Sequence, residues 1–189
     1  MSYSSENTHL MWLVVSELIR NTIFTTADCI IWKKSNAIPN NRSKNKLTRI
    51  IEYVFVLCRK TELKTFHANK KVMSRIEKTG QANYENVYNY LDAKNNDGSN
   101  KLNKATYSTE LVTKLLNIYG TQFGLVYDPF SGISTTALSA IKFGMNYVGS
   151  EISKEQVEYG DILLHKVKII DEEPPNIMKS SNDDDFWNS

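Results

Sequence analysis

The sequence contains little cysteine and no long uninterrupted apolar run. Its two cysteines, Cys29 and Cys58, each lie inside an apolar stretch and lack the spacing of metal ligands or of a disulfide framework. We therefore expect two buried free thiols and no metal site. No apolar run approaches the roughly 20 residues that cross a bilayer, and the N-terminus has no basic region followed by an apolar one. The sequence predicts a cytoplasmic protein that does not enter a membrane.

Excess charge of either sign is also scarce in the chain as a whole, since the formal net charge is only +2. The charges are nevertheless unevenly distributed. Residues 33–78 contain thirteen lysines and arginines against three glutamates, whereas residues 171–189 are rich in aspartate and glutamate. This asymmetry indicates one half that faces a polyanion, and an acidic tail that we expect to be disordered. A length of 189 residues suits one domain with a real core.

The clearest pattern lies between residues 125 and 153. An apolar run of β type, Leu125 to Tyr127, ends at Asp128, and a turn that contains a glycine follows. A segment of helical period then leads to a second β-type run, which ends just before Glu151. This order predicts a parallel βαβ unit, in which ligands bind beyond the carboxyl ends of the strands. Asp128 and Glu151 occupy these two ends, and an acid after the second strand suits ribose hydroxyls.

The turn itself, Asp-Pro-Phe-Ser-Gly-Ile-Ser-Thr-Thr from Asp128 to Thr136, carries a resemblance. It resembles the motif Asp-Pro-Phe-x-Gly-x-Gly-Thr-Thr of the S-adenosylmethionine-dependent DNA amino-methyltransferases, which methylate adenine N6 or cytosine N4. The alternative is an ordinary strand-turn-helix of an α/β protein. The resemblance implies S-adenosyl-L-methionine as the cofactor, with contacts from Asp128, Pro129, Phe130, Ser131, Gly132, Thr135 and Glu151, and from Thr106 in the preceding segment.

The turn departs from this motif once, at Ser134, where the family has a second glycine. We expect the Ser134 hydroxyl to cap the helix that follows. We also expect its Cβ to crowd a ligand that lies on the turn.

The N-terminal half predicts one helix and two strands. Apolar side chains recur at helical spacing from His9 to Arg20, and near-continuous apolar runs follow at Phe24 to Trp32 and at Ile50 to Leu57. Such runs fit strands that are covered on both faces. The fold class that we predict is α/β, with part of a Rossmann-like methyltransferase sheet and helices on both of its faces.

The loop between these two strands is basic and rich in asparagine and serine. Trp-Lys-Lys-Ser-Asn from Trp32 and Arg-Ile-Ile-Glu-Tyr from Arg49 look like the hairpin region of the same family. Lysine and arginine neutralise phosphates, and asparagine side chains reach base edges. The alternative is a solvated loop, and we expect Trp32 to pack in the core or at its rim. The residues predicted to contact double-stranded DNA are Lys33, Lys34, Asn36, Arg42, Lys44, Lys46 and Arg49.

Residues 61–103 are the least predictable part of the chain. Their position between the hairpin region and the cofactor motif implies, by the resemblance, a short target-recognition segment. The alternative is a surface excursion with one helix near Tyr84 to Ala93. A helix is predicted to begin at Ser108 or Thr109, and Lys154 to Lys168 has the pattern of an amphipathic helix. We expect residues 1–170 to form the methyltransferase domain and residues 171–189 the disordered tail.

One family motif is absent. The resemblance implies a tetrapeptide with two prolines and an aromatic residue, which holds the exocyclic amine of a flipped-out base. Asp128-Pro129-Phe130 has only one proline, and Glu173-Pro174-Pro175-Asn176 has no aromatic residue. We therefore expect the N-terminal catalytic strands to be missing, with the chain covering the C-terminal two-thirds of a family enzyme, and we assign no catalytic residue.

Two functions from different classes fit this sequence. The first is a split or truncated S-adenosylmethionine-dependent DNA methyltransferase that carries the cofactor-binding and DNA-binding parts and needs a complementing chain for catalysis. The second is a non-catalytic nucleic-acid-binding module that keeps the fold. Asp128 and Glu151 favour retained cofactor binding, whereas the absent tetrapeptide favours loss of catalysis. Missing strands would leave two apolar sheet edges, which we expect either to pair directly or to require a complementing polypeptide.

Overall fold

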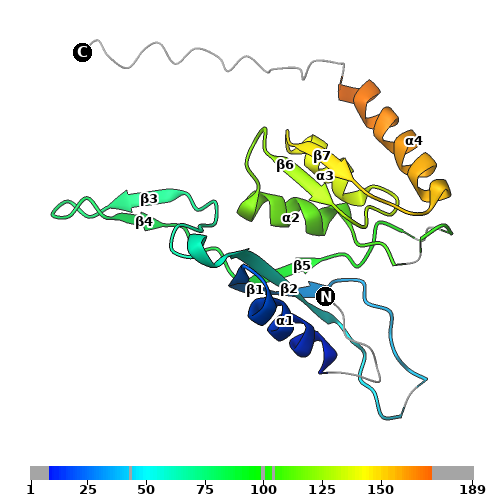
Figure 1. The fold of residues 1–189 in the computed structure, drawn as a ribbon, viewed down its shortest axis with the longest axis horizontal. Helices are drawn as coiled ribbons and strands as arrows, with labels where there is room; N and C mark the ends of the chain where they lie inside the picture. Colours follow the sequence, from blue (N-terminus) through cyan, green and yellow to red (C-terminus); the bar gives the residue numbers. More distant parts are fainter. Residues whose placement is uncertain (1–8, 43, 99–100, 104, 172–189) are drawn as a thin grey trace, which may run out of the picture.

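The computed structural model describes residues 9–42, 44–98, 101–103 and 105–171. Most of the predicted acidic tail lies outside the described residues. The fold is α/β, as predicted (Figure 1). Its elements are α1 (Leu10–Asn21), β1 (Phe24–Lys34), β2 (Ile51–Arg59), the 3₁₀ turn η1 (Lys60–Glu62), β3 (Val72–Arg75), β4 (Ala82–Tyr84), β5 (Tyr90–Ala93), α2 (Thr109–Tyr119), β6 (Leu125–Asp128), α3 (Thr135–Lys142), β7 (Asn146–Gly149) and α4 (Lys154–Asp171).

The first sheet has the strand order β2-β1-β5, with β1 antiparallel to β2 and parallel to β5. On one face, the Trp12 ring of α1 packs against Tyr53 at 5.4 Å and Phe55 at 5.6 Å between ring centroids. On the other face, Ile30 and Trp32 are buried with residues of β5 and α2. Successive side chains of a strand point to opposite faces. The predicted covering of this sheet on both faces is therefore confirmed.

The core of this sheet depends on the alternation of β1 and β5. Leu91 and Ala93 of β5 are buried beside Trp32, whose indole N–H donates to the Ala93 carbonyl at 3.1 Å. Trp32 is thus a core residue, as expected. The helix near Tyr84 to Ala93 is wrong, because the segment pairs with β1 and buries every second side chain. Tertiary pairing outweighs local propensity in so short a segment.

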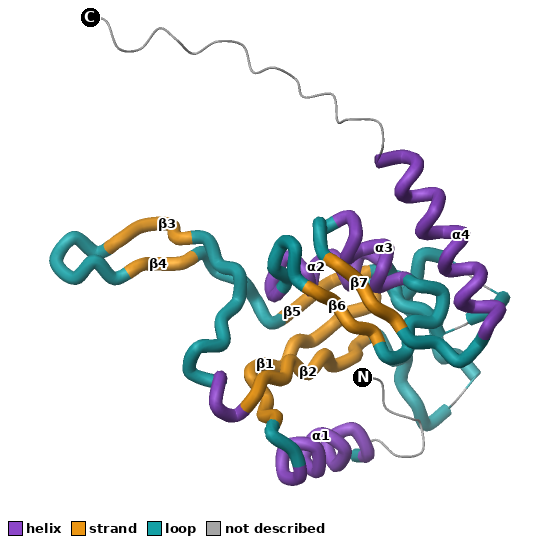
Figure 2. Tube along the Cα trace, turned by 45° about the horizontal axis from the view of Figure 1, so that its top comes forward, coloured by secondary structure: helices purple, strands orange, loops and turns teal. Residues whose placement is uncertain are grey.

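The second sheet consists of β6 and β7, which are parallel and joined by α3, as the βαβ pattern predicts. Helix α2 packs on α3, and α3 packs on α4 (Figure 2). Within the described residues β6 has no strand neighbour on its outer edge, and no ladder joins the two sheets. Leu125 and Tyr127 of β6 remain 65% and 60% exposed. The β6 edge and the first sheet therefore do not pair directly in the described residues.

The helix starts agree with the sequence. The Ser108 hydroxyl caps α2 by accepting from the Leu111 N–H at 3.2 Å, and it donates to the Lys94 carbonyl at 2.7 Å. Cys58 is a buried free thiol, as expected, whereas Cys29 is a free thiol that is only half-buried, so the expected burial of Cys29 is wrong. Within the described ranges there is no cluster of side chains that could hold a metal ion. Among those same residues, no helix has the length and apolar character required to cross a membrane.

Candidate functional site

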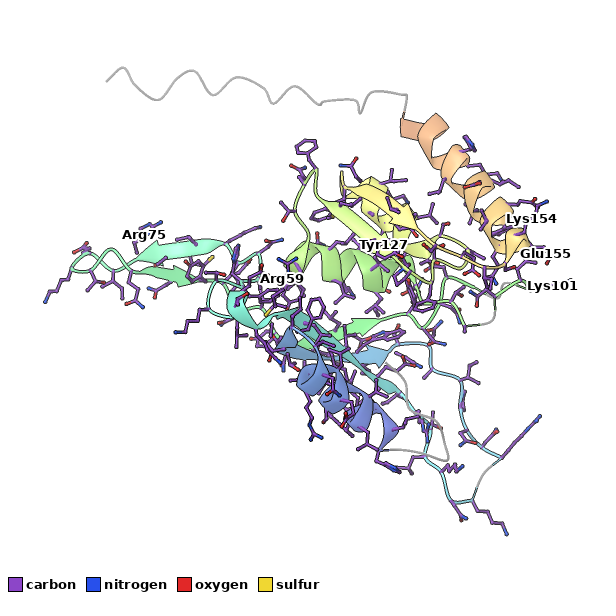
Figure 3. All side chains as sticks on the ribbon, viewed as in Figure 1. Arg59, Arg75, Lys101, Tyr127, Lys154 and Glu155 are labelled. Atoms are coloured by element: carbon purple, nitrogen blue, oxygen red, sulfur yellow. The ribbon has the colours of Figure 1, made fainter. Side chains whose placement is uncertain are left out.

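The carboxyl ends of β6 and β7 are locked together by backbone hydrogen bonds. The Ser150 N–H donates to the Asp128 carbonyl at 2.9 Å, and the Ser131 N–H donates to the Ser150 carbonyl at 2.9 Å. The turn after β6 and the segment after β7 therefore form one continuous edge. The beginning of α4, marked by Lys154 and Glu155 in Figure 3, lies on the same side of the molecule as this edge.

The Asp128 carboxylate is already occupied by three donors of the protein. Its Oδ2 accepts from the Thr136 hydroxyl at 2.7 Å and from the Tyr107 hydroxyl at 3.2 Å. Its Oδ1 accepts from the Phe130 N–H at 3.0 Å. Burial raises the pKa of Tyr107 to about 12, so this hydroxyl keeps its proton and remains a donor at neutral pH. These bonds indicate that Asp128 orders the turn.

The Glu151 carboxylate anchors the other side of the turn. Its Oε2 accepts from the Gly132 N–H and its Oε1 accepts from the Ser153 N–H, both at 2.9 Å. The bond from Ser153, supported by that from Gly132 and opposed by desolvation, lowers the pKa of Glu151, which is ionised at neutral pH. A carboxylate offers about four acceptor positions. A backbone hydrogen bond from Ile152 contributes to the same lowering, so Glu151 keeps part of its acceptor capacity free.

Gly132 is required in the turn for two reasons. Its φ is +53°, and a Cβ there would lie 2.8 Å from the Asn103 side-chain nitrogen. Asn103 is in turn held by the Gln156 side chain at 3.0 Å and by the Ala105 N–H at 2.9 Å. The segment before α2 thus lies directly against the turn. Asn103 was not predicted from the sequence, because its neighbours on the turn and on α4 are remote in the chain.

The remaining predicted cofactor residues surround the same turn. Thr106 and Thr135 line a cavity of about 210 Å³ between the segment at residues 97–109, α3 and α4. Phe130, which follows Pro129, is 86% exposed, and Ile152 next to Glu151 is fully exposed. Ile152 was not identified from the sequence, where a single isoleucine after a strand carries no signal.

Ser134 does not cap α3, so that prediction is wrong. The residue stands at the N-cap with φ 67° and ψ 31° and makes no capping hydrogen bond with its side chain. Only 8% of Ser134 is exposed, and a Cβ at Gly160 of α4 would lie 3.1 Å from the Ser134 Cβ and closer still to its hydroxyl. The side chain that we expected to crowd a ligand is instead packed against α4.

Three of the predicted DNA-contacting residues are engaged within the protein. Lys33 pairs with Asp92 at 2.8 Å, and Lys34 pairs with Glu52 while its ammonium lies 5.4 Å from the centre of the Trp32 ring. The side-chain oxygen of Asn36 accepts from the backbone N–H of Asn95. These contacts fix the base of the loop at the carboxyl ends of β1 and β5.

The tip of the loop carries the exposed cations Arg42, Lys44 and Lys46, whereas Arg49 is half-buried. In Figure 1 the loop and the turn after β6 lie toward the same side of the molecule. Hydrogen bonds link the two segments. The Ser108 hydroxyl donates to the carbonyl of Lys94, which follows β5, and the hydroxyl of Tyr107, next to Ser108, donates to Asp128. The structure therefore brings the basic loop and the acidic turn to one edge of the fold.

Comparison with known proteins gives a consistent result. The sequence model of the N6/N4 methyltransferase family, described as DNA methylase, matches residues 2–161. The Type II methyltransferase M.Cfr9I of Citrobacter freundii is 30% identical over 139 residues, which are 74% of this chain and 43% of that protein. The chain thus spans less than half the length of this curated relative.

Two solved structures share the fold. The PvuII DNA methyltransferase, described as cytosine-N4-specific, matches with a TM-score of 0.64 at 17% identity, over 85% of this chain and 59% of its own. A complex of M1.HpyAVI with SAM matches with a TM-score of 0.60 at 20% identity, over 82% and 70% respectively.

The contact between Ser134 and Gly160 generates a double-mutant prediction. Gly160→Ala should lower the free energy of unfolding by about 1–3 kcal/mol, because its methyl group overlaps the Ser134 side chain. In a Ser134→Gly background the same change should be neutral or stabilising by up to about 1 kcal/mol, since alanine is the better helix former. Urea titrations of the four proteins measure the coupling. Ser131→Gly, a serine-to-glycine change in the same turn, is the control for Ser134→Gly. If the changes in unfolding free energy at residues 134 and 160 simply add, the contact is refuted.

A second prediction concerns alkaline pH and Tyr107. The folded state holds the Tyr107 proton up to a pKa of about 12, against an ordinary value of 10.0. The stabilisation that Tyr107 contributes is complete below pH 10 and is lost as the pH rises toward 12. The parent should therefore lose up to about 3 kcal/mol more than Tyr107→Phe across this interval. Urea titrations at several alkaline pH values test this, with the exposed Tyr88→Phe as control; equal behaviour of both variants would contradict it.

Proposed function

The chain belongs to the N6/N4 DNA methylase family, and from that premise we propose that it binds S-adenosyl-L-methionine at the carboxyl ends of β6 and β7. We assign it to the cofactor-binding and DNA-binding part of a methyltransferase for adenine N6 or cytosine N4. The observation that carries this proposal is the Glu151 carboxylate, ionised and with acceptor positions left over, across a turn that Asp128 holds in place.

The residues at this edge fit the cofactor. Ribose hydroxyls suit the acceptor capacity that Glu151 keeps, and the exposed side chains of Phe130 and Ile152 offer apolar surface to an adenine ring. The cofactor supplies a methyl group bound to a positively charged sulfur. The nearby carboxylates of Asp128 and Glu151 favour this positive charge. Pro129, Ser131, Gly132, Thr135 and Thr106 complete the proposed set of contacts.

Double-stranded DNA is the proposed substrate, and the loop at residues 35–50 is its proposed contact. Arg42, Lys44 and Lys46 are exposed at the tip, where they are able to neutralise phosphates. Lys33, Lys34 and Asn36 have a different part in this proposal. Their contacts with Asp92, Glu52 and the β5 segment hold the loop at the cofactor edge, and Arg49 lies at its base.

Catalysis in this proposal needs a complementing polypeptide. The chain lacks the tetrapeptide that holds an exocyclic amine, and the described part of β6 has a free outer edge with exposed Leu125 and Tyr127. Unpaired strand edges invite another strand. We therefore propose that a segment bearing the two prolines and the aromatic residue docks beside β6, and that residues 1–170 act as one domain with it.

Calorimetric titration with S-adenosyl-L-methionine tests the cofactor site. Glu151→Ala should raise the dissociation constant at least about tenfold, because the ribose hydroxyls lose a charged acceptor. Glu155→Ala removes a neighbouring exposed acid and is the matched control. Far-ultraviolet circular dichroism of each variant checks that the turn residues still fold. Equal affinity of parent and Glu151→Ala would sink the assignment, and absence of binding by the parent would leave the nucleic-acid-binding module as the function.

A methyl-transfer assay tests the need for a complementing polypeptide. The purified chain, incubated with radiolabelled cofactor and duplex DNA of mixed sequence, should transfer no methyl group. Transfer should appear when a fragment with the tetrapeptide strand is added, and the same fragment with its two prolines replaced by alanine is the control. Robust transfer by the chain alone would mean that other residues hold the exocyclic amine.

A further inference from the structure

The side chain of Tyr147 in β7 ends in a buried hydroxyl that has no hydrogen-bond partner. Among the buried side-chain nitrogen and oxygen atoms of the described residues, this oxygen alone has none. A buried hydroxyl that is left unpaired costs free energy, so such a group in a folded protein needs an explanation. A phenylalanine ring would fill the same space, and packing therefore does not explain the oxygen. The hydroxyl is a candidate for a role in binding.

The ring and the hydroxyl of Tyr147 lie in different surroundings. The ring lines a cavity of about 350 Å³ together with Ile141 of α3 and Leu164 of α4, on the side of β7 where α3 packs (Figure 2). The hydroxyl lies further along the strand, over Gly149, because alternate residues of a strand share a face. A Cβ on Gly149 would overlap the Tyr147 hydroxyl and would lie 2.9 Å from the Ser131 Cβ. Gly149 thus leaves room for the hydroxyl to reach the turn after β6.

The Tyr147 hydroxyl and the Ser131 side chain meet over Gly149. Burial raises the pKa of Tyr147, and the Asp128 carboxylate adds to this rise, whereas the Ser131 side chain opposes it. The Tyr147 hydroxyl therefore keeps its proton at neutral pH and is available as a donor. Although Ser131 is near enough to exert this influence, no well-aligned hydrogen bond joins the two hydroxyls. The Ser131 oxygen changes its position by rotation about a single bond, which is a small movement.

Ser131 lies between Tyr147 and the proposed cofactor. Its side chain is half-buried, and the turn that carries it leads into α3 at Thr135. The first turn of a helix favours a negative charge. On the proposed cofactor only the carboxylate is negative, whereas the sulfur and the ribose suit the acids Asp128 and Glu151. The carboxylate is therefore the group expected beside Ser131.

We infer that Tyr147 is a positioning residue of the cofactor site: it donates to the Ser131 oxygen, and the Ser131 hydroxyl donates to the carboxylate of the bound cofactor. The inference rests on the proposed function, because that function puts the cofactor on this turn. A hydroxyl that accepts one hydrogen bond becomes a stronger donor in the next. Through this chain Tyr147 obtains a partner, so that cofactor binding removes the cost of its burial.

Calorimetric titration of Tyr147→Phe with two ligands tests this role. S-adenosyl-L-methionine carries the carboxylate, and decarboxylated S-adenosylmethionine lacks only that group; the weaker ligand is titrated by displacement. Tyr147→Phe should raise the dissociation constant for the first about three- to tenfold, the usual range for one hydrogen bond, and leave that for the second unchanged. Tyr88→Phe removes the hydroxyl of a residue that is 74% exposed and is the control.

A double-mutant cycle with Ser131→Ala tests the route through Ser131. Ser131→Ala should weaken the binding of S-adenosyl-L-methionine, and the addition of Tyr147→Phe should cause no further loss. The urea midpoint of Tyr147→Phe without cofactor should equal or exceed that of the parent, because the change removes an unpaired buried hydroxyl. A lower midpoint, with equal losses of affinity for both ligands, would make Tyr147 a folding residue only and would overturn the inference.

Further outcomes separate this inference from the proposed function. If Glu151→Ala weakens cofactor binding and Tyr147→Phe does not, the inference fails and the proposed function stands. If the losses from Ser131→Ala and Tyr147→Phe add, Tyr147 does not act through Ser131, and the inference is again wrong. A parent chain that binds neither ligand would overturn both.

Discussion

The Asp128 carboxylate accepts hydrogen bonds from three separate segments, and the candidate site depends on these bonds. Thr136 belongs to α3, Phe130 to the turn, and Tyr107 to the segment before α2. One charged group at the end of a short strand thus fixes a helix, a turn and a connection in a single arrangement. Hydrogen bonds to a charged group are among the stronger ones in proteins. Loss of this carboxylate would loosen all three segments together, including the backbone on which Glu151 is anchored.

The first sheet is linked to this arrangement through α2. Ser108 at the start of α2 is bonded to Lys94 after β5, and Lys114 further along α2 is bonded to the Asp92 carbonyl and to Glu110. The basic loop is held to the same end of the sheet by its own contacts with β5 and β2. Although no strand ladder joins the two sheets in the described residues, side-chain contacts keep the basic loop and the turn between Asp128 and Glu151 in a fixed arrangement.

The sequence predicted the parts of this site that local pattern determines. The βαβ unit followed from apolar runs and a glycine turn, and the positions of Asp128 and Glu151 followed from the ends of its strands. The bond from Tyr107 to Asp128 joins residues 21 positions apart and becomes visible only in the fold. The pairing of Lys34 with Glu52 depends on the register of β1 and β2, which no local rule specifies. Likewise the β5 segment is too short for its period to distinguish a strand from a helix.

The contact between Ser134 and Gly160 limits the order in which these two positions can change. The motif that the turn resembles has glycine at the position of Ser134, where φ is positive, and in this chain Ser134 faces Gly160 of α4. A Cβ at position 160 would crowd the Ser134 side chain. Such a pair is acquired in two substitutions. If serine enters at position 134 while position 160 still carries a Cβ, the intermediate is crowded. If glycine enters at position 160 first, it is not. The turn and α4 therefore constrain each other's substitutions, and a change transplanted from a relative into one of them should be read together with the residue in the other.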